Sequence, residues 1–279
     1  MIVLYRWMTG LPSCILRGPS WSFVFFVFFV LKMRSFNQPN GASSEPAATS
    51  NGRTGPDPAL PQTASSLRIA PTEPRKPPMA LHIDYYASLN SPWTHLGAAR
   101  IEAMAMANGA TLRIFPVDFG AIFAGSGGLP LPKRSAQRQA YRLQELPRWR
   151  DHLGIPINIQ PKHFPSNEMP AAACVIGLRE TVGDAPAIKL AHRVLKAVWQ
   201  EEKNTGDLET LAALIRDIGL NPDAVLKLGA DPQWAAMRIA DTEAALARGV
   251  FGAPCYVIGE DIFWGQDRLE FVQRRLARG

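Results

Sequence analysis

The sequence predicts an α/β fold in which a β-α-β unit at residues 79–120 and closing elements at residues 241–279 are separated by an all-α segment, residues 121–240. The chain has 279 residues, and 47% of them are hydrophobic, which is enough for a sizeable core. Short segments of strand character occur near residue 82 and again near residue 255, and helical periodicity fills the region between them.

The first unit has the order strand, helix, strand. Residues 82–88 and 111–117 are predicted strands with aromatic and β-branched content, and residues 92–108 are a predicted helix closed by Gly109. Because a helix connects the two strands, we expect them to be parallel with a right-handed crossover.

The middle segment is predicted to be helical after a loop. Residues 118–132 are rich in Gly and Pro and are predicted to be a loop, and residues 155–169 are predicted to be irregular. Residues 133–152 form an amphipathic pattern that Pro147 is expected to kink or divide. Further predicted helices span 170–182, 186–203, 207–218, 221–228 and 231–248.

The last segment returns to strand character. Cys255–Ile258 and Asp261–Phe263 are predicted to form a hairpin across Gly259 and Glu260, and Asp267–Ala277 is the predicted closing helix.

Residues 1–78 differ in composition from the rest of the chain. Residues 21–31 are almost entirely apolar, but the run is shorter than the roughly 20 residues that span a bilayer. Residues 37–78 are rich in Pro, Ser, Gly, Ala and Thr and are predicted to be disordered. Met79 directly precedes the first strand, so we expect residues 1–78 to be a mis-assigned extension; an export or anchor segment is the alternative.

The charge of the predicted folded part is close to neutral. The whole chain carries a formal charge of +6, but residues 79–279 contain 22 basic and 21 acidic residues. This balance gives no basis for nucleic-acid binding, and we expect no membrane association for residues 79–279. Three cysteines without paired spacing favour a reducing, cytoplasmic location, and five histidines without ligand spacing predict no metal site.

The loop after the first strand continues as Ser91-Pro92-Trp93-Thr94. Ser91 is the predicted N-cap of the following helix, and Pro92 fits the first helical turn. In thioredoxin-type proteins this corner holds a Cys-x-x-Cys pair, whereas here it contains no sulfur. We therefore hypothesise that Ser91 hydrogen-bonds to the thiolate of a ligand, for which glutathione is the obvious carrier; a simple helix cap is the alternative.

Pro254 follows a Gly-rich turn and directly precedes a strand. Thioredoxin folds hold a cis-proline at this place, which leaves the backbone of the preceding residue free to pair with an extended peptide. Ala253 is then expected to bind the cysteinyl part of glutathione through its backbone, and an ordinary trans proline is the alternative.

Gln266 and Asp267 stand at the start of the closing helix. Backbone amides at this start suit the γ-glutamyl carboxylate, and Asp267 suits its ammonium group. The alternative is a capping box in which Glu270 partners Asp267.

Other side chains carry weaker signals. A substrate carboxylate could be held by one of four basic residues that border irregular segments, namely Lys133, Arg134, Lys162 and His163, although most such groups are solvated surface. Cys255 is either a small buried residue or a redox-sensitive one. For Trp149 and Trp199, packing in the core is the favoured interpretation.

Over essentially all of residues 82–279 the chain resembles the 2-hydroxychromene-2-carboxylate isomerases and the related kappa-class glutathione transferases. The resemblance rests on four motifs, namely residues 90–93, 146–149, 249–254 and 263–269. It implies a thioredoxin-like fold with a helical insertion, a homodimer, and glutathione as cofactor. It makes Ser91 catalytic and gives a cofactor-binding set of Ser91, Pro92, Trp93, Ala253, Pro254, Gln266, Asp267 and Arg268.

Two positions depart from the family pattern. The family usually has a ligand-contacting Asn after the second strand, where this chain has Gly125-Ser126-Gly127-Gly128, and it commonly has Thr where this chain has Cys255.

The resemblance predicts a glutathione-dependent isomerase of a small aromatic 2-hydroxychromene-2-carboxylate-type substrate, with a trans-o-hydroxybenzylidenepyruvate-type product. A kappa-like glutathione transferase and a non-catalytic binding protein of thioredoxin fold are the alternatives.

Overall fold

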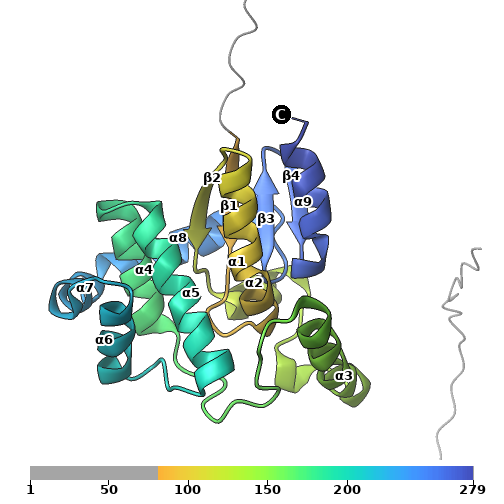
Figure 1. Cartoon of the computed structure of the whole chain (residues 1–279), viewed down its shortest axis with the longest axis horizontal. Coiled ribbons are helices and arrows are strands. Elements are labelled where there is room, and N and C mark those ends of the chain that lie inside the picture. The colour runs from red at the N-terminus through yellow and green to blue at the C-terminus, as the bar shows by residue number, and fades with distance from the viewer. Residues whose placement is uncertain (1–80, 279) are drawn as a thin grey trace, which may run out of the picture. The chain divides into compact units, whose positions relative to one another are not determined.

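A four-stranded mixed sheet lies at the centre of residues 81–278, the part of the chain that the computed structural model describes (Figure 1). The strands are β1 (His82–Tyr86), β2 (Thr111–Phe115), β3 (Cys255–Ile258) and β4 (Asp261–Trp264), in the order β2-β1-β3-β4. β1 and β2 are parallel, as predicted from the helix between them, and β3 is antiparallel to both of its neighbours. The predictions for residues 1–78 lie outside the described residues.

Helices cover both faces of the sheet. Alternate residues of a strand point to opposite faces. In β3, Tyr256 and Ile258 therefore join the large core that includes α1 (Pro92–Ala107), while Cys255 and Val257 join a second core with helices of the other face. The remaining helices of the large core are α4 (Met169–Thr181), α5 (Asp184–Glu201), α6 (Leu208–Asp217), α7 (Pro222–Gly229) and α9 (Leu269–Leu276).

The second core holds a helix at residues predicted to be a loop, so the prediction of a loop over 118–132 is wrong. α2 (Phe119–Ser126) begins at its N-cap Asp118, whose carboxylate accepts the Gly120 N–H, and ends at Gly127 in a left-handed conformation. Phe119 and Ile122 pack into the second core, and α8 (Gln233–Ala247) packs against α2. Burial of these apolar side chains outweighs the poor helix propensity of the glycines.

Two further boundaries differ from expectation. α3 (Ala136–Leu153) is one helix that contains Pro147, so the proline does not divide it. The predicted closing helix begins instead with the 3-10 turn η2 (Gln266–Arg268), followed by α9. A second short 3-10 turn, η1 (Leu131–Lys133), precedes α3.

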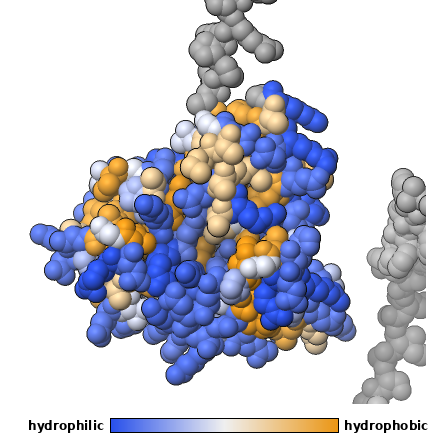
Figure 2. Space-filling view, viewed as in Figure 1, coloured by the Kyte–Doolittle hydropathy of each residue, from blue (hydrophilic) through white to orange (hydrophobic). Residues whose placement is uncertain are grey.

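The long helical segment packs on the sheet through one continuous core. α4 contacts α5, α7 and α8, and α5 contacts α1 and β2. Residues 81–278 lie within a single compact unit. The division of the chain into a thioredoxin-like part and a helical insertion at residues 121–240 therefore stays a prediction. The face drawn in Figure 2 is mostly hydrophilic, with hydrophobic residues gathered over α4–α7 and beside α3. Within the described residues, none of the helices is long and apolar enough to cross a membrane.

Candidate active site

Four chain segments meet at one end of the sheet because of its strand directions. Tyr86, the last residue of β1, pairs with Phe115 at the end of β2 and with Cys255 at the start of β3. Cys255 also pairs with Trp264, the last residue of β4. The loops that follow β1, β2 and β4 and the loop that precedes β3 therefore share this end, as expected from parallel and antiparallel pairing.

Ser91 lies in the loop after β1, where the sequence places it. It is the N-cap of α1, with extended backbone angles, and its Oγ accepts the N–H of Thr94 at 3.2 Å. Among the described residues the Ser91 hydroxyl donates to no acceptor, so its proton is free for a ligand at the positive end of α1. The predicted cap and the predicted Pro92 at the first helical position are both confirmed.

The peptide bond between Ala253 and Pro254 is cis, as predicted. The carbonyl of Pro254 accepts the N–H of Gly265 at 2.8 Å, which joins this turn to the end of β4. Within residues 81–278 the N–H and C=O of Ala253 have no hydrogen-bond partner. An extended peptide backbone lying beside Ala253 would satisfy both groups.

The side chain of Gln266 is buried and accepts a hydrogen bond from a side chain of α1. Arg100 on α1 donates to the Gln266 Oε1 at 2.7 Å and to its backbone oxygen at 3.2 Å. The neighbouring carboxylate of Asp267 pairs with Arg268 at 2.7 Å. The capping-box alternative is wrong, because neither η2 nor α9 has a side-chain cap hydrogen bond.

Two adjoining cavities lie at this end of the sheet. One has a volume of about 660 Å³ and is lined by Ser91, Pro92 and Trp93, and the other has about 640 Å³ and is lined by Gln266, Asp267 and Arg268. Both volumes are in the range of small-molecule sites. Their shared wall is formed by Trp93, Arg134, Arg138, Arg142, Ala253 and Trp264. The cavities are named below the Ser91 cavity and the Gln266 cavity.

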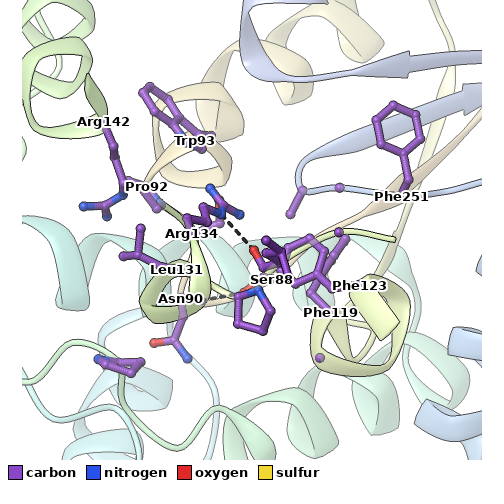
Figure 3. A pocket seen from close by; sticks show the side chains of 18 of the residues that line it. Ser88, Asn90, Pro92, Trp93, Phe119, Phe123, Leu131, Arg134, Arg142 and Phe251 are labelled. Carbon is purple, nitrogen blue, oxygen red and sulfur yellow. Dashed lines mark hydrogen bonds between the residues drawn. The ribbon is translucent and has the colours of Figure 1, made fainter. Parts of the chain in front are cut away.

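The Ser91 cavity has an aromatic side that sequence reasoning missed. Phe119 and Phe123 line it from α2, and Phe251 lines it from the turn before β3; Figure 3 shows these rings across from Trp93 and Arg142. Phe251 packs against Trp264 with ring centroids 4.9 Å apart and the two ring planes tilted by 58°. The spacing of the two α2 phenylalanines was the available signal, but the surrounding glycines made the segment look like a loop.

A partly buried carboxylate supports the loop that carries Ser91. Glu168, at the start of α4, pairs with Arg238 at 2.8 Å and accepts the hydroxyl of Ser88 at 3.1 Å. Asn90 donates to the carbonyl of Ser166 at 2.8 Å. Burial raises the pKa of Glu168, although Arg238 and the hydrogen bonds act in the opposite direction. These contacts fix the Ser91 loop against α4 and α8.

The other candidate residues from the sequence are distributed between the two cavities, a third cavity and the core. Of the four basic residues, Arg134 lines both large cavities, Lys162 and His163 line a separate shallow one, and Lys133 lines none of these. Trp199 is buried in a hydrophobic cluster, and Trp149 packs against that cluster and lines the Gln266 cavity. Cys255 is fully buried. Within residues 81–278 there is no cluster of three potential metal ligands.

Comparison with known proteins agrees with this architecture. A model of the DSBA-like thioredoxin domain matches residues 82–277. Solved structures under 25% identity share the fold, among them the cytosolic disulfide reductase DsbM of Pseudomonas aeruginosa with GSH, at 14% identity and a TM-score of 0.50 over 71% of this chain and 100% of that one.

The curated relatives include three 2-hydroxychromene-2-carboxylate isomerases. That of Pseudomonas putida is 28% identical over 70% of this chain and 94% of its own length. That of Sphingobium xenophagum is 26% identical over 71% of this chain and 99% of its own length. A solved 2-hydroxychromene-2-carboxylate isomerase matches with a TM-score of 0.59 at 27% identity, over 71% of this chain and 95% of that one. These matches support isomerase activity, and the chain belongs to the family of DSBA-like thioredoxin domain proteins.

Proposed function

We propose that this protein is a glutathione-dependent isomerase that converts 2-hydroxychromene-2-carboxylate-type substrates to trans-o-hydroxybenzylidenepyruvate-type products. The observation that carries the proposal is the pair of adjoining cavities. One presents the unpartnered hydroxyl proton of Ser91 and the other presents polar groups suited to a peptide, while Ala253 lies in the wall between them.

The polar groups of the Gln266 cavity fit glutathione. The free N–H and C=O of Ala253 suit the backbone of the cysteinyl residue. The carboxylate of Asp267 suits the γ-glutamyl ammonium group, and the adjacent Arg268 suits a carboxylate. Because Arg100 donates to both the side-chain and the backbone oxygen of Gln266, we assign Gln266 a role through its backbone N–H.

Ser91 and α1 then act on the sulfur. When bound, glutathione supplies a thiolate that adds to the conjugated substrate and leaves again after bond rotation, so that none is consumed. The Ser91 hydroxyl donates a hydrogen bond to the sulfur and favours its ionised form. The N-terminus of α1, which Ser91 caps, adds its partial positive charge.

The Ser91 cavity fits a small aromatic carboxylate. Its wall combines the rings of Phe119 and Phe123 with Leu131 and with arginine side chains. Apolar walls with a few polar groups are typical of sites that orient a small ligand. We keep the sequence-based predictions of a homodimer and a cytoplasmic location alongside this assignment.

Product analysis tests the proposal. Purified protein is incubated with 2-hydroxychromene-2-carboxylate with and without glutathione, and products are followed by chromatography. We expect isomerised product only with glutathione and unchanged total glutathione. A stable adduct would favour the transferase alternative, and failure to bind glutathione in calorimetry would favour a binding protein without turnover.

A further inference from the structure

Three arginines line both cavities, and none of them has a carboxylate partner in the part of the chain that the structure describes. Arg138 and Arg142 lie one turn apart on α3, and Arg134 precedes the helix. None of the three takes part in an ion pair within residues 81–278, whereas the neighbouring Arg148 and Arg150 of α3 both pair with acidic residues. The arginines that face the cavities are thus left for a ligand.

Arg142 is the most deeply placed of the three. Its guanidinium lies over the rings of Phe164 and Trp199, 5.4 and 5.7 Å from their centroids. Its Nη2 is buried and has no hydrogen-bond partner among residues 81–278. Burial, and then the charge of Arg134, lower the pKa of Arg142 to about 10. A desolvated guanidinium charge without a counter-ion is costly, and an anionic ligand beside Arg142 would offset that cost.

Among the described residues, little negative charge in the Ser91 cavity offsets the charge of these arginines. The Ser91 cavity is lined by three arginines but by a single carboxylate, that of Glu168. Glu168 is already engaged by Arg238 and Ser88. The cavity therefore carries an excess of positive charge beside its aromatic wall, which is the complement of an aromatic carboxylate.

Arg134 is less suited than Arg142 to bind an anionic ligand. Its Nε donates to the carbonyl of Leu129 at 2.8 Å, and its guanidinium lies 5.7 Å from the ring centroid of Phe123. Arg134 thus closes the aromatic side of the cavity. No hydrogen bond from Arg142 exists within residues 81–278, so its donors other than the buried Nη2 remain available for the oxygens of a carboxylate.

We propose that Arg142 binds the carboxylate of the aromatic substrate and fixes the ring on the side of Phe119 and Phe123. The proposal rests on the proposed function, because it names the group that orients that substrate. It makes Arg142 a specificity-determining residue that separates acids from their uncharged analogues.

Binding of a matched pair of ligands tests this role. Cinnamate and cinnamamide have the same ring and differ in charge, and their affinities are measured by calorimetry on the full chain, with and without glutathione. The native protein is expected to prefer cinnamate. Arg142→Gln is expected to weaken cinnamate binding about 10- to 100-fold, since a hydrogen bond to a charged group contributes on this scale, and to leave cinnamamide and glutathione binding unchanged.

Two variants complete the design. Arg150→Gln makes the same change on α3 at a residue that lines neither cavity, and it should bind both ligands as the native protein does. Arg142→Lys keeps the charge but loses the planar fork, so it should lose less of the cinnamate affinity; it replaces Arg142→Gln if that variant does not fold.

The outcomes separate this proposal from the proposed function. Equal cinnamate affinity in Arg142→Gln and native protein, or an equal loss for cinnamamide, would overturn the role of Arg142. Absence of isomerase activity would contradict the proposed function. Because the ligand affinities are measured without turnover, they would still test whether Arg142 binds the carboxylate.

Discussion

Cys255 follows the cis proline directly, yet it lines neither of the two cavities. It is fully buried in the second core, and this burial raises its pKa to about 12. Cys174 is also buried, and burial raises the pKa of its thiol to about 12. Because the thiolate is the nucleophilic form, neither residue supplies a reactive sulfur at neutral pH. This agrees with a mechanism that borrows its thiol from a ligand.

Alkylation should leave both buried cysteines untouched. Native protein treated briefly with iodoacetamide at pH 7.5, then digested and analysed by mass spectrometry, is expected to show unmodified peptides for Cys174 and Cys255. Protein unfolded in guanidinium chloride serves as the control and should be modified at both. Rapid labelling of Cys255 in the native protein would restore the redox-sensitive interpretation.

Single residues with local signals could be predicted from the sequence. Ser91 was predictable because a Ser-Pro pair at a strand-helix junction fixes both the cap and the first turn, and Pro254 because of its place before the strand. Arg142 was not predictable. An arginine on an amphipathic helix is normally solvated, and only the packing of Phe164 and Trp199 beneath it shows that this one is desolvated.

At the scale of elements, α1 and η2 depend on one glycine. A Cβ at Gly97 would lie 2.6 Å from the Tyr256 Oη and 3.1 Å from the Gln266 Cβ. The absence of a side chain lets α1 approach η2 closely enough for Arg100 to hold Gln266. The two ends of the proposed glutathione site are thereby held at a fixed separation.

Gly97→Ala should separate α1 from η2. The extra methyl group overpacks a buried contact, which costs about 1–3 kcal/mol and exceeds the roughly 1 kcal/mol that alanine gains in helix propensity. We expect a lower urea midpoint and weaker glutathione binding by calorimetry. Ala99→Ser adds one atom on the exposed side of α1 and should change neither quantity. Native glutathione affinity in Gly97→Ala would contradict the coupling of α1 to η2.

Element boundaries were predictable where capping and burial signals coincide. Residues 207–218 and 221–228 were expected to be helical from their caps, and α6 and α7 occupy these positions with Asp207 and Asn221 as N-caps. α2 could not be predicted, because the glycines of this segment indicate a loop. The helix is stabilised by packing of its two phenylalanines against β1 and β3, which local sequence does not show.

At the scale of the whole described molecule, His95 connects α1 to the helical segment. Its Nε2 lies 3.2 Å from the carbonyl oxygen of Pro156 and 3.2 Å from the Nε2 of Gln200 on α5. Burial lowers the pKa of His95 to about 4, and the hydrogen bond to Pro156 opposes the shift. The folded protein thus holds this imidazole neutral.

This shift makes stability depend on pH. Since the pKa of His95 is lower in the folded chain, unfolding takes up a proton between the unfolded value of 6.5 and the folded value of about 4. The contribution is present above pH 6.5 and is lost as the pH falls to 4, by about 3 kcal/mol. Urea unfolding across this range should show a smaller loss in His95→Gln than in the native protein. Identical pH dependence in both would contradict the assignment.

The architecture as a whole was predictable because its order of elements is distinctive. Two strand-containing units with helices between them give a parallel pair and a hairpin, and the sheet order β2-β1-β3-β4 satisfies both. What the sequence could not give is the joining of the two cavities. It depends on Arg138 and Arg142 of α3 and on Arg134, which lies two residues before the start of that helix. All three are far from Ala253 in the chain.

Activity of Ser91→Ala is the most direct test of the central claim, that the Ser91 hydroxyl keeps a borrowed thiol ionised. The variant loses the helix cap, at a cost of about 1 kcal/mol, and Asp207→Ala removes the cap of α6 as a matched control. With glutathione and 2-hydroxychromene-2-carboxylate, we predict a fall in kcat of about 100- to 1000-fold for folded Ser91→Ala and native kcat for Asp207→Ala. Native kcat in Ser91→Ala would contradict the account.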